Sequence, residues 1–317
     1  MPQVLFALLP DFVLLDVAEA AEAFRMAERE VPGTYDVKFI GSSPSIVSGV
    51  GLKVTGVEAL PQQVPDGAVI VVTGVVGRTV DFGQEAIQRL AEWLKEVMGN
   101  ETVTLMCICA GSVIAAHAGL LKGVECTTHH AHIDELSRIE KQAIVHSNRI
   151  FVEHGRICSS AGVTAGLDLA LHMIGQRLGH RVAAAVARDL VVYRRRSGSD
   201  AALSPWVMHR NHLHPAVHRV QDAIAKNPAL RWSAARLAEV ACMSSRNLAR
   251  LFAEHAGCSP LDYVQRLRVA LARELVTHSN LDLERVAARA GFTSAHQLRR
   301  VWRRWESQSP VAHRLNT

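Results

Sequence analysis

The sequence predicts an α/β sandwich built on a mainly parallel sheet, followed by an all-α domain that contains two helix-turn-helix units. Its 317 residues exceed the usual size of a single hydrophobic core, which favours two domains. Short β-branched runs alternate with helical patterns over the first 190 residues, and from residue 216 onward only helical patterns remain. A composition of 49% hydrophobic and 21% charged residues is typical of globular domains.

The two halves also differ in charge. Residues 201–317 contain 17 Lys and Arg against 8 Asp and Glu, a net charge of +9. The chain totals of 35 and 30 leave 18 basic and 22 acidic residues for residues 1–200, a net charge of −4. The second half is therefore suited to approach a polyanion, and the first half is not.

The first domain is expected to span residues 1–193. Its clearest strand patterns are the β-branched runs at residues 4–9, 36–40, 68–72 and 103–108. Helical patterns lie between and after them, at residues 17–29, 84–97, 166–178 and 182–193. Alternation of this kind is typical of parallel strands joined by helices that cover both faces of a sheet.

A polar segment without apolar periodicity follows at residues 194–200, and the stretch from there to Pro215 contains two prolines and three histidines. We therefore expect residues 194–215 to form a linker. For the three arginines at residues 194–196, a solvated linker is the default interpretation and phosphate contact is the alternative.

The six cysteines do not have the paired spacing of a metal site. A chain of this length also does not need a disulfide framework to be stable. We expect no metal and no cofactor, and a cytoplasmic location. The apolar stretch at residues 1–24 lacks a basic region and carries Asp11 and Asp16, so a buried strand and a helix are expected there rather than a signal peptide. No apolar run reaches the roughly 18–20 residues that a membrane span needs, so no membrane partner is expected.

The second domain is expected to span residues 216–317. Its first helix has an apolar stripe at positions 217, 220 and 224, and a longer helix at about residues 261–278 has another at 261, 264, 267, 271 and 275. Pro260 begins the longer helix behind Ser259 as its N-cap, where the missing N–H costs nothing.

This helical domain contains an internal repeat at a shift of about fifty residues. Residues 237–242 align with residues 286–291 at an offset of 49, and residues 248–252 align with 298–302 at an offset of 50. One residue is therefore inserted in the second turn. Each unit is expected to form a helix, a tight turn and a second helix, capped by Ser244 or Thr293. Gly291 suits a left-handed turn, and Cys242 is a weaker residue at the matching place.

The second helix of such a unit presents the N-terminal side of its exposed face to a major groove of double-stranded DNA. A connecting helix of some 18 residues is about 27 Å long, which can hold the two second helices in adjacent grooves roughly 34 Å apart. The alternatives are a helical bundle whose arginines only solvate its surface, and nucleic-acid coating without sequence preference. The candidate base-contacting residues are Ser245, Arg246, Asn247 and Arg250 in the first unit, and Ala295, His296, Gln297, Arg299 and Arg300 in the second.

Residues 216–317 resemble the DNA-binding domain of AraC-type regulators. The resemblance rests on Gly-Phe-Thr-Ser at residues 291–294, on Leu298, Arg300 and Trp302, and on Ser-Pro at residues 309–310. Leu298 and Trp302 stand where the family usually has Phe, and residues 306–308 replace the usual Gly before Ser-Pro; these are conservative packing changes. The resemblance implies a sequence-specific transcription regulator, with RNA polymerase as a further candidate partner.

In the first domain, Cys109 lies at a corner between an apolar strand and a helical run. A strand, a small-residue turn and a helix form a nucleophile elbow, which holds the thiol strained and exposed at a helix N-terminus. The positive end of that helix is expected to lower the thiol pKa. Cys107 points the opposite way on the strand and is expected to be a small core residue.

Around this cysteine, residues 3–190 resemble the PfpI-type, class I glutamine-amidotransferase-like fold, a flavodoxin-like sandwich. The resemblance rests on residues 11–16, 119–121 and 127–129, and on Ser159, Ala161, Gly162 and Asp168. It implies an acid at Asp16 and a base at His129, and it is nearest to regulators that fuse this fold to an AraC-type domain and sense small, often nitrogen-containing metabolites. The ligand-binding candidates that follow are Asp16, Gly74, Val75, Cys109, Ala110 and His129.

Three uses of this domain stay open from the sequence. Cys109, Asp16 and His129 are the candidate catalytic set of a cysteine-dependent hydrolase or hydratase, with DNA binding secondary. Against turnover, Val75 stands where the family's enzymes commonly have the second glycine of a pair near the oxyanion hole. We favour a sensor without enzymatic turnover that forms a homodimer through this domain, and a vestigial dimerisation scaffold is the third use. Because His129, His130 and His132 lack matching metal ligands, a pocket rim or helix start is expected there.

Overall fold

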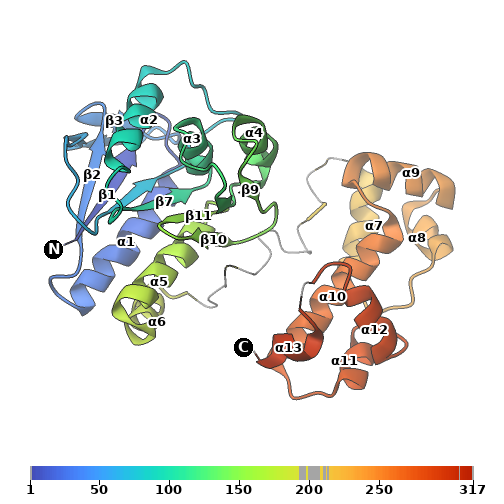
Figure 1. Cartoon of the computed structure of the whole chain (residues 1–317). Coiled ribbons are helices and arrows are strands. Elements are labelled where there is room, and N and C mark those ends of the chain that lie inside the picture. The colour runs from blue at the N-terminus through green and yellow to red at the C-terminus, as the bar shows by residue number, and fades with distance from the viewer. Residues whose placement is uncertain are drawn as a thin grey trace. The chain divides into compact units, whose positions relative to one another are not determined.

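Figure 1 shows the computed structural model, which describes residues 2–192, 198, 208–209, 212, 214–306 and 308–315. The chain forms two compact units, Met1–Ala202 and Leu203–Thr317. Their division falls inside the predicted linker at residues 194–215, most of which lies outside the described residues. The three arginines at residues 194–196 lie outside them as well, so their interpretation stays a prediction.

The first unit is built on a seven-stranded sheet with the strand order β10-β11-β7-β6-β1-β2-β5. Neighbouring strands are parallel, except that β10 and β11 are antiparallel. All four residues of β6 are buried apolar side chains, as expected for a strand covered on both faces. The strands are β1 (Gln3–Leu8), β2 (Asp36–Gly41), β5 (Glu58–Ala59), β6 (Val69–Val72), β7 (Thr104–Ile108), β10 (Phe151–His154) and β11 (Ile157–Ser160).

Helices cover both faces of this sheet (Figure 1). On one face, α1 (Leu14–Glu30), α5 (Ala165–Leu178) and α6 (His180–Asp189) cover a core that includes Phe6 and Phe24. On the other face, α2 (Glu85–Val97), α3 (Gly111–His117) and α4 (Ile133–Ile139) cover a core that includes Leu5 and Leu94. Leu5 and Phe6 point to opposite faces because side chains alternate along a strand. The predicted α/β sandwich with a mainly parallel sheet is confirmed.

Shorter elements border the sheet. β3 (Ser45–Val47) and β4 (Lys53–Thr55) form an antiparallel hairpin, and β8 (Glu125–Cys126) pairs with β9 (Ile144–Val145). A single 3₁₀ turn, η1 (His130–His132), precedes α4. The sequence patterns considered above do not identify these pieces, because each is too short to show a period.

The second unit consists of seven described helices, and no strand lies among its described residues. The predicted apolar stripe at positions 217, 220 and 224 is fully buried. Two separate cores form, one around Leu237, Phe252 and Leu267, the other around Val286 and Trp302. The helices are α7 (Pro215–Lys226), α8 (Ala234–Ala241), α9 (Ser245–Ala256), α10 (Pro260–His278), α11 (Leu283–Arg289), α12 (Ala295–Trp302) and α13 (Pro310–Leu315).

Side-chain caps explain where five of these helices begin. Each capping oxygen accepts a hydrogen bond from the backbone N–H three residues later, which satisfies a donor that the helix itself leaves unpaired. Ser259 caps α10 in this way, as the sequence predicts, and Pro260 follows it. The caps are Ser233, Ser244, Ser259, Asp282 and Ser294.

In the part of the chain that the structure describes, no helix has both the length and the apolar character that a bilayer crossing requires.

Candidate functional site

Cys109 lies at the turn between β7 and α3 with a left-handed backbone, φ 57°. Its N–H donates a hydrogen bond to the carbonyl oxygen of Ser160, at the end of β11 (3.1 Å). Thr128 Oγ1 in turn donates to the carbonyl oxygen of Cys109 (2.7 Å). Residues other than glycine rarely adopt this conformation and need surrounding contacts to hold it. The structure therefore contains the strained corner that the sequence predicts.

Asp16 lies in the first turn of α1 and is fully buried. One of its carboxylate oxygens accepts a hydrogen bond from the N–H of Gly74 (3.1 Å), and the other accepts one from the N–H of Val163 (2.8 Å). Burial raises the pKa of Asp16 to about 6, while the two N–H groups and the Cys109 side chain act in the opposite direction. The predicted acid thus lies against the cysteine, with both oxygens engaged.

The thiol of Cys109 is not exposed as the elbow pattern predicts, because the residue is only 6% exposed. Burial, and then the charge of Asp16, raise the pKa of the thiol to about 12, and the N–H of Ala110 offsets only part of this. The predicted lowering of the thiol pKa is therefore wrong. α3 has seven residues, and its positive end does not outweigh desolvation. At neutral pH the sulfur is a protonated thiol and a weak nucleophile.

Two glycines make room for this pair of side chains. A Cβ built on Gly74 would lie 2.8 Å from the Cβ of Cys109 and 2.9 Å from an oxygen of Asp16. A Cβ built on Gly162 would lie 2.4 Å from the Cβ of Cys109, and Gly162 has a left-handed backbone, φ 81°. Real Cβ atoms do not approach other atoms this closely, so glycine is required at both places. The cysteine is enclosed by packing rather than left open to a ligand.

Val75 and Ala110 frame the same end of the sheet. Val75 pairs with Phe12 through an isolated antiparallel bridge, and its half-buried side chain packs against the core under α2 and α3. Ala110 is fully buried, and its N–H is directed to the sulfur of Cys109. Both residues therefore lie near Cys109 at the carboxyl ends of β6 and β7, but neither offers a free side-chain polar group.

His129 is not bonded to Cys109. Its ring accepts a hydrogen bond from the N–H of Ala131 (3.4 Å) and lies against His130, with ring centroids 4.1 Å apart. Burial, and to a smaller degree the charges of His130 and His132, lower the pKa of His129 to about 4. Within the described residues, no hydrogen bond joins this ring to the sulfur. The structure therefore contains the predicted acid beside the cysteine, but not a cysteine–histidine hydrogen bond.

In the helical unit, the first repeat places a row of exposed side chains on α9. Cys242 ends α8 with a left-handed backbone, φ 54°, as its alignment with Gly291 predicts. Arg250 donates to Glu254 (2.9 Å) and to Asn247 (3.1 Å), whereas Arg246 has no hydrogen bond or ion pair with another described residue. The exposed residues at the N-terminal side of this helix are Ser245, Arg246, Asn247 and Arg250.

The second repeat differs from the prediction in two details. Ser294, not Thr293, caps α12, because the inserted residue shifts the offset to 50 before the cap rather than after it. Thr293 instead donates from its N–H to Gln297 Oε1 (2.7 Å). Ala295 is only 2% exposed, so its side chain cannot reach a base edge. His296, Arg299 and Arg300 are exposed and Gln297 is half-buried, which leaves these four as the candidates on α12.

The two repeats meet at a joint formed by residues 228–230, Arg268, Gly291 and Phe292. Arg268, on α10, is buried and donates to the carbonyl oxygens of Pro228 (2.9 Å) and Leu230 (3.0 Å). Its guanidinium also lies over the ring of Phe292, 6.0 Å from the centroid. A Cβ on Gly291 would lie 2.6 Å from the Cα of Ala229. Arg268 and Gly291 therefore fix how the second repeat packs against the loop between α7 and α8.

Comparison with known protein families agrees with this geometry. A family model described as the DJ-1/PfpI family matches residues 2–176, more than half of the chain. The chain belongs to the DJ-1/PfpI family. A second model, described as a helix-turn-helix domain, matches residues 237–316, which includes both repeats. The chain thus joins a DJ-1/PfpI domain to an AraC-type helix-turn-helix domain, as the sequence predicts.

Relatives with the same two-part organisation carry regulator names. The chain is 26% identical over 304 residues to the HTH-type transcriptional regulator GbdR of Pseudomonas aeruginosa, a match that covers 95% of this chain and 80% of GbdR. It is 28% identical over 310 residues to the regulator CdhR of the same species, a match that covers 98% of this chain and 90% of CdhR. It is 29% identical over 320 residues to the regulator GlxA of Rhizobium meliloti, a match that covers 96% of this chain and 93% of GlxA.

Solved structures support the fold. An AraC family transcriptional regulator from Pseudomonas putida superimposes with a TM-score of 0.53 at 19% identity, covering 60% of this chain and 100% of that chain. A putative transcriptional regulator from Vibrio parahaemolyticus superimposes with a TM-score of 0.52 at 12% identity, covering 60% of this chain and 98% of that chain. At these identities the likeness concerns the fold.

Three residues of the DJ-1/PfpI site are absent from the candidates that the sequence provides. Val163 supplies one N–H to Asp16, Thr128 holds the elbow carbonyl, and Gly162 gives Cys109 its space. Of the three, Gly162 alone has a usable sequence signal, because it is a glycine among the residues that carry the family resemblance. The other two contribute through one backbone N–H and one hydroxyl, whose partners are distant in the chain, so no local pattern marks them.

Proposed function

We propose that this protein is a sequence-specific, DNA-binding transcription regulator. The observation that carries the proposal is the pair of helix-turn-helix repeats on one long helix. α10 has 19 residues, which corresponds to about 28 Å at 1.5 Å per residue. Residues 201–317, which include this unit, have a net charge of +9, whereas residues 1–200 have a net charge of −4. A rigid element of this length suits two neighbouring major grooves on one side of a duplex, about 34 Å apart.

Arg246 and Arg300 are the side chains that we expect to read bases. Arg246→Ala and Arg300→Ala should each relax the preference at a defined position of the selected DNA sequence, with a loss of about 1–3 kcal/mol in discrimination. Selection of binding sequences from a random DNA pool, followed by sequencing, measures this. Arg289→Ala is the matched control, since Arg289 is an exposed arginine on α11, the first helix of the second repeat.

The control variant should leave the selected sequence unchanged, whatever its effect on total affinity, because a phosphate contact carries no base information. If the arginine variants on α9 and α12 select the same sequences as the wild type, the base-reading assignment is wrong. Nucleic-acid coating without sequence preference predicts that no sequence is enriched for any of these proteins.

We further propose that the DJ-1/PfpI domain binds a small effector at the carboxyl ends of its strands, beside Asp16, Gly74, Val75, Cys109, Ala110 and His129. In parallel sheets this edge is the usual place for ligands. A groove of about 350 Å³ is lined by the start of α1 and by Gly49, Val50 and Val76, which include the sequence neighbours of Asp16 and Val75 but none of the six residues themselves. That the effector contains nitrogen rests on the family resemblance alone.

The domain is proposed to sense rather than to catalyse. A hydrolase or hydratase acting through Cys109 would require a thiolate, but the sulfur is enclosed and its pKa is raised to about 12. The hydrogen bond from a histidine base that would activate it is also absent from the described residues. The strained elbow at Cys109 favours enzymatic turnover, which is therefore the second candidate function of this domain. The experiment below tests it directly.

A thermal-shift screen of amino acids, betaines and related amines against the full chain tests the sensor. We expect at least one compound to raise the melting temperature, and we expect Cys109→Ala to retain that rise, because sensing requires binding only. A product formed by the wild type and not by Cys109→Ala would favour the enzyme instead.

In this proposal the protein acts in the cytoplasm as a homodimer that is joined through its DJ-1/PfpI domains. Effector binding would change the relation of the two protomers and hence of their DNA-binding domains, with RNA polymerase as the partner of an activator. Exposed apolar side chains support an interface, among them Leu15, Val50 and Val76, which are 47%, 74% and 60% exposed. These three also line the groove proposed for the effector, so in this proposal the groove lies at the dimer interface. Sedimentation at micromolar concentration would contradict the dimer if only the monomer mass appeared.

A further inference from the structure

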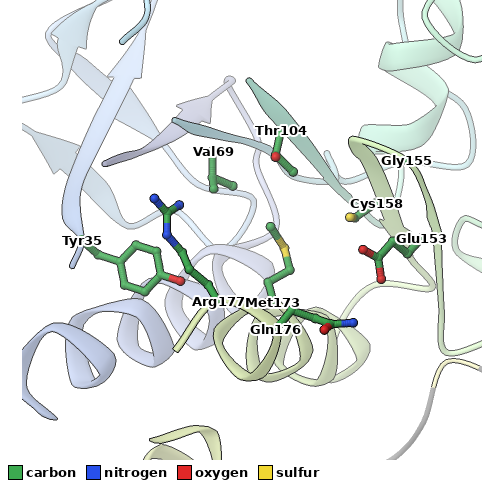
Figure 2. Close-up of a pocket in the computed structure, with 9 residues that line it drawn as sticks. All are labelled: Tyr35, Val69, Thr104, Glu153, Gly155, Cys158, Met173, Gln176 and Arg177. Atoms are coloured by element: carbon green, nitrogen blue, oxygen red, sulfur yellow. The ribbon is translucent and has the colours of Figure 1, made fainter. Parts of the chain in front are cut away.

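A second cavity lies at the amino ends of β6 and β7, the opposite ends of these strands from Cys109. Figure 2 shows the residues that line it. Its volume is about 310 Å³, within the range of small-molecule sites. Thr104 and Val69, the first residues of β7 and β6, line it together with α5 and the β10–β11 hairpin. Cys109 follows the last residue of β7, so the whole length of that strand separates this cavity from the site described above.

One wall of the cavity carries a fixed cation. Arg177, on α5, donates from Nη1 to the carbonyl oxygen of Gly67 (3.3 Å), and its guanidinium lies over the ring of Tyr35, 5.6 Å from the centroid. Tyr35 is itself buried. Among the described residues no carboxylate forms an ion pair with Arg177, so its charge is available to an anion in the cavity.

The other wall carries a fixed anion. Glu153, on the edge strand β10, has one carboxylate oxygen 2.6 Å from Nε2 of His172. That contact holds the side chain in place and leaves the second oxygen free of any described hydrogen bond. Figure 2 shows Glu153 and Arg177 on opposite sides of the cavity, with Met173 between them.

The surface between the two charges is apolar. Val69 and Met173 contribute aliphatic and thioether groups, and Cys158 is buried with its thiol pKa raised to about 12 by burial. A neutral buried thiol behaves as a small hydrophobic group. A ligand that matches this cavity therefore has a carboxylate at one end, an ammonium group at the other and a short aliphatic chain between them.

We propose that this cavity is a second ligand site, specific for a short aliphatic zwitterion whose charged ends are separated by several methylene groups. The carboxylate pairs with Arg177 and the ammonium group pairs with Glu153, while the methylene groups lie on Met173 and Val69. Neither charge of the protein is cancelled by the other, because no described ion pair joins them. Because Met173 lies between the two charges, we expect a compound with both charges on adjacent carbons to pair with only one of them.

A chain of side-chain contacts connects the cavity to residue 198 of the linker, and we infer that ligand binding acts on the rest of the protein along it. His172, the partner of Glu153, lies against Phe151 with ring centroids 4.8 Å apart and the ring planes tilted by 36°. Gly198, the one described residue of the polar segment 194–200, packs on Phe151 so closely that a Cβ would lie 2.8 Å from the Phe151 carbonyl oxygen. Three contacts, Glu153 with His172, His172 with Phe151 and Phe151 with Gly198, therefore connect a ligand on Glu153 to the linker. This regulatory part rests on the proposed function.

Isothermal titration of the full chain with 4-aminobutyrate, 5-aminopentanoate and 6-aminohexanoate tests the site. Pentanoate and pentylamine serve as half-ligands, and glycine serves as the zwitterion with close charges. We expect at least one of the three ω-amino acids to bind at one site per chain, at least tenfold more tightly than glycine or either half-ligand. If none of the three gives saturable binding, the proposal is overturned.

Two charge variants locate the binding. Arg177→Gln should weaken the ω-amino acid and pentanoate at least tenfold, and Glu153→Gln should weaken the ω-amino acid and pentylamine to the same degree. Arg89→Gln and Glu92→Gln, exposed positions on α2, are the matched controls and should bind as the wild type does. Because Glu153 lies on an edge strand with an exposed carboxylate, its variant is expected to fold even if Arg177→Gln does not. Wild-type binding by Glu153→Gln would overturn the site.

A DNA titration separates the site from its regulatory use. The ω-amino acid should change the affinity of the wild type for its selected DNA sequence and should leave that of Glu153→Gln unchanged. Saturable binding without a change in DNA affinity would retain the ligand site and reject its connection to the linker. Failure of the protein to select any DNA sequence would reject the proposed regulator while the calorimetric result still stands.

Discussion

Replacing Gly162 by alanine is expected to destabilise the DJ-1/PfpI domain by about 2–5 kcal/mol. Two effects add. Gly162 has φ 81°, where a Cβ strains the backbone, and that Cβ would lie 2.4 Å from the Cβ of Cys109. Cys109 cannot move away, because its N–H is bonded to Ser160 and its carbonyl to Thr128. Differential scanning calorimetry of the full chain should show the transition of this domain lowered by roughly 5–15 °C.

Gly51→Ala is the control that separates backbone strain from the contact with Cys109. Gly51 has φ 83°, nearly the value at Gly162, but no atom lies within 4 Å of the position of its Cβ. Its substitution should cost only about 1–2 kcal/mol, the strain of the left-handed backbone. Equal effects of the two substitutions would mean that the elbow can accept an added methyl group. In that case the enclosed state of Cys109 described above would be wrong.

The corner at Cys109 can be predicted from the sequence, but its burial cannot. A strand, small residues and a helix are consecutive in the chain, so a local pattern is enough to place a strained turn. The exposure and the pKa of the thiol depend on Gly162 and Asp16, which reach it from other parts of the fold. A helix-end argument considers one favourable interaction and omits desolvation, which here is the larger effect.

The helical unit shows the same contrast between features that neighbouring residues mark and features that they do not. Helix starts are local, so Ser244 and Ser259 can be recognised as caps from neighbouring residues alone. For α12 the repeat predicts a cap at Thr293, one residue before Ser294, because the position of an insertion inside a turn has no local marker. The burial of Ala295 follows from helical periodicity, since Leu298 and Trp302 lie on its face and are buried too.

Gly291→Ala is expected to disturb the joint between the two repeats, with a loss of stability of about 2–5 kcal/mol in the helical unit. Gly291 has φ 85°, and a Cβ there would lie 2.6 Å from the Cα and 2.7 Å from the carbonyl oxygen of Ala229. These are backbone atoms in the loop that Arg268 holds through Pro228 and Leu230. No side chain can rotate to relieve the overlap, so the second repeat must shift relative to that loop or unfold.

DNA binding distinguishes these two outcomes. A shifted but folded second repeat should lose affinity for the full selected sequence while it retains the weak binding of a duplex that contains only the part read by α9. Gly257→Ala is the control, because Gly257 ends α9 with φ 65° and nothing lies within 4 Å of its Cβ position. It should lower stability by about 1–2 kcal/mol and leave the preferred sequence intact. If Gly291→Ala kept wild-type affinity for the full sequence, the joint would not set the spacing of the two recognition helices, and α10 alone would have to account for it.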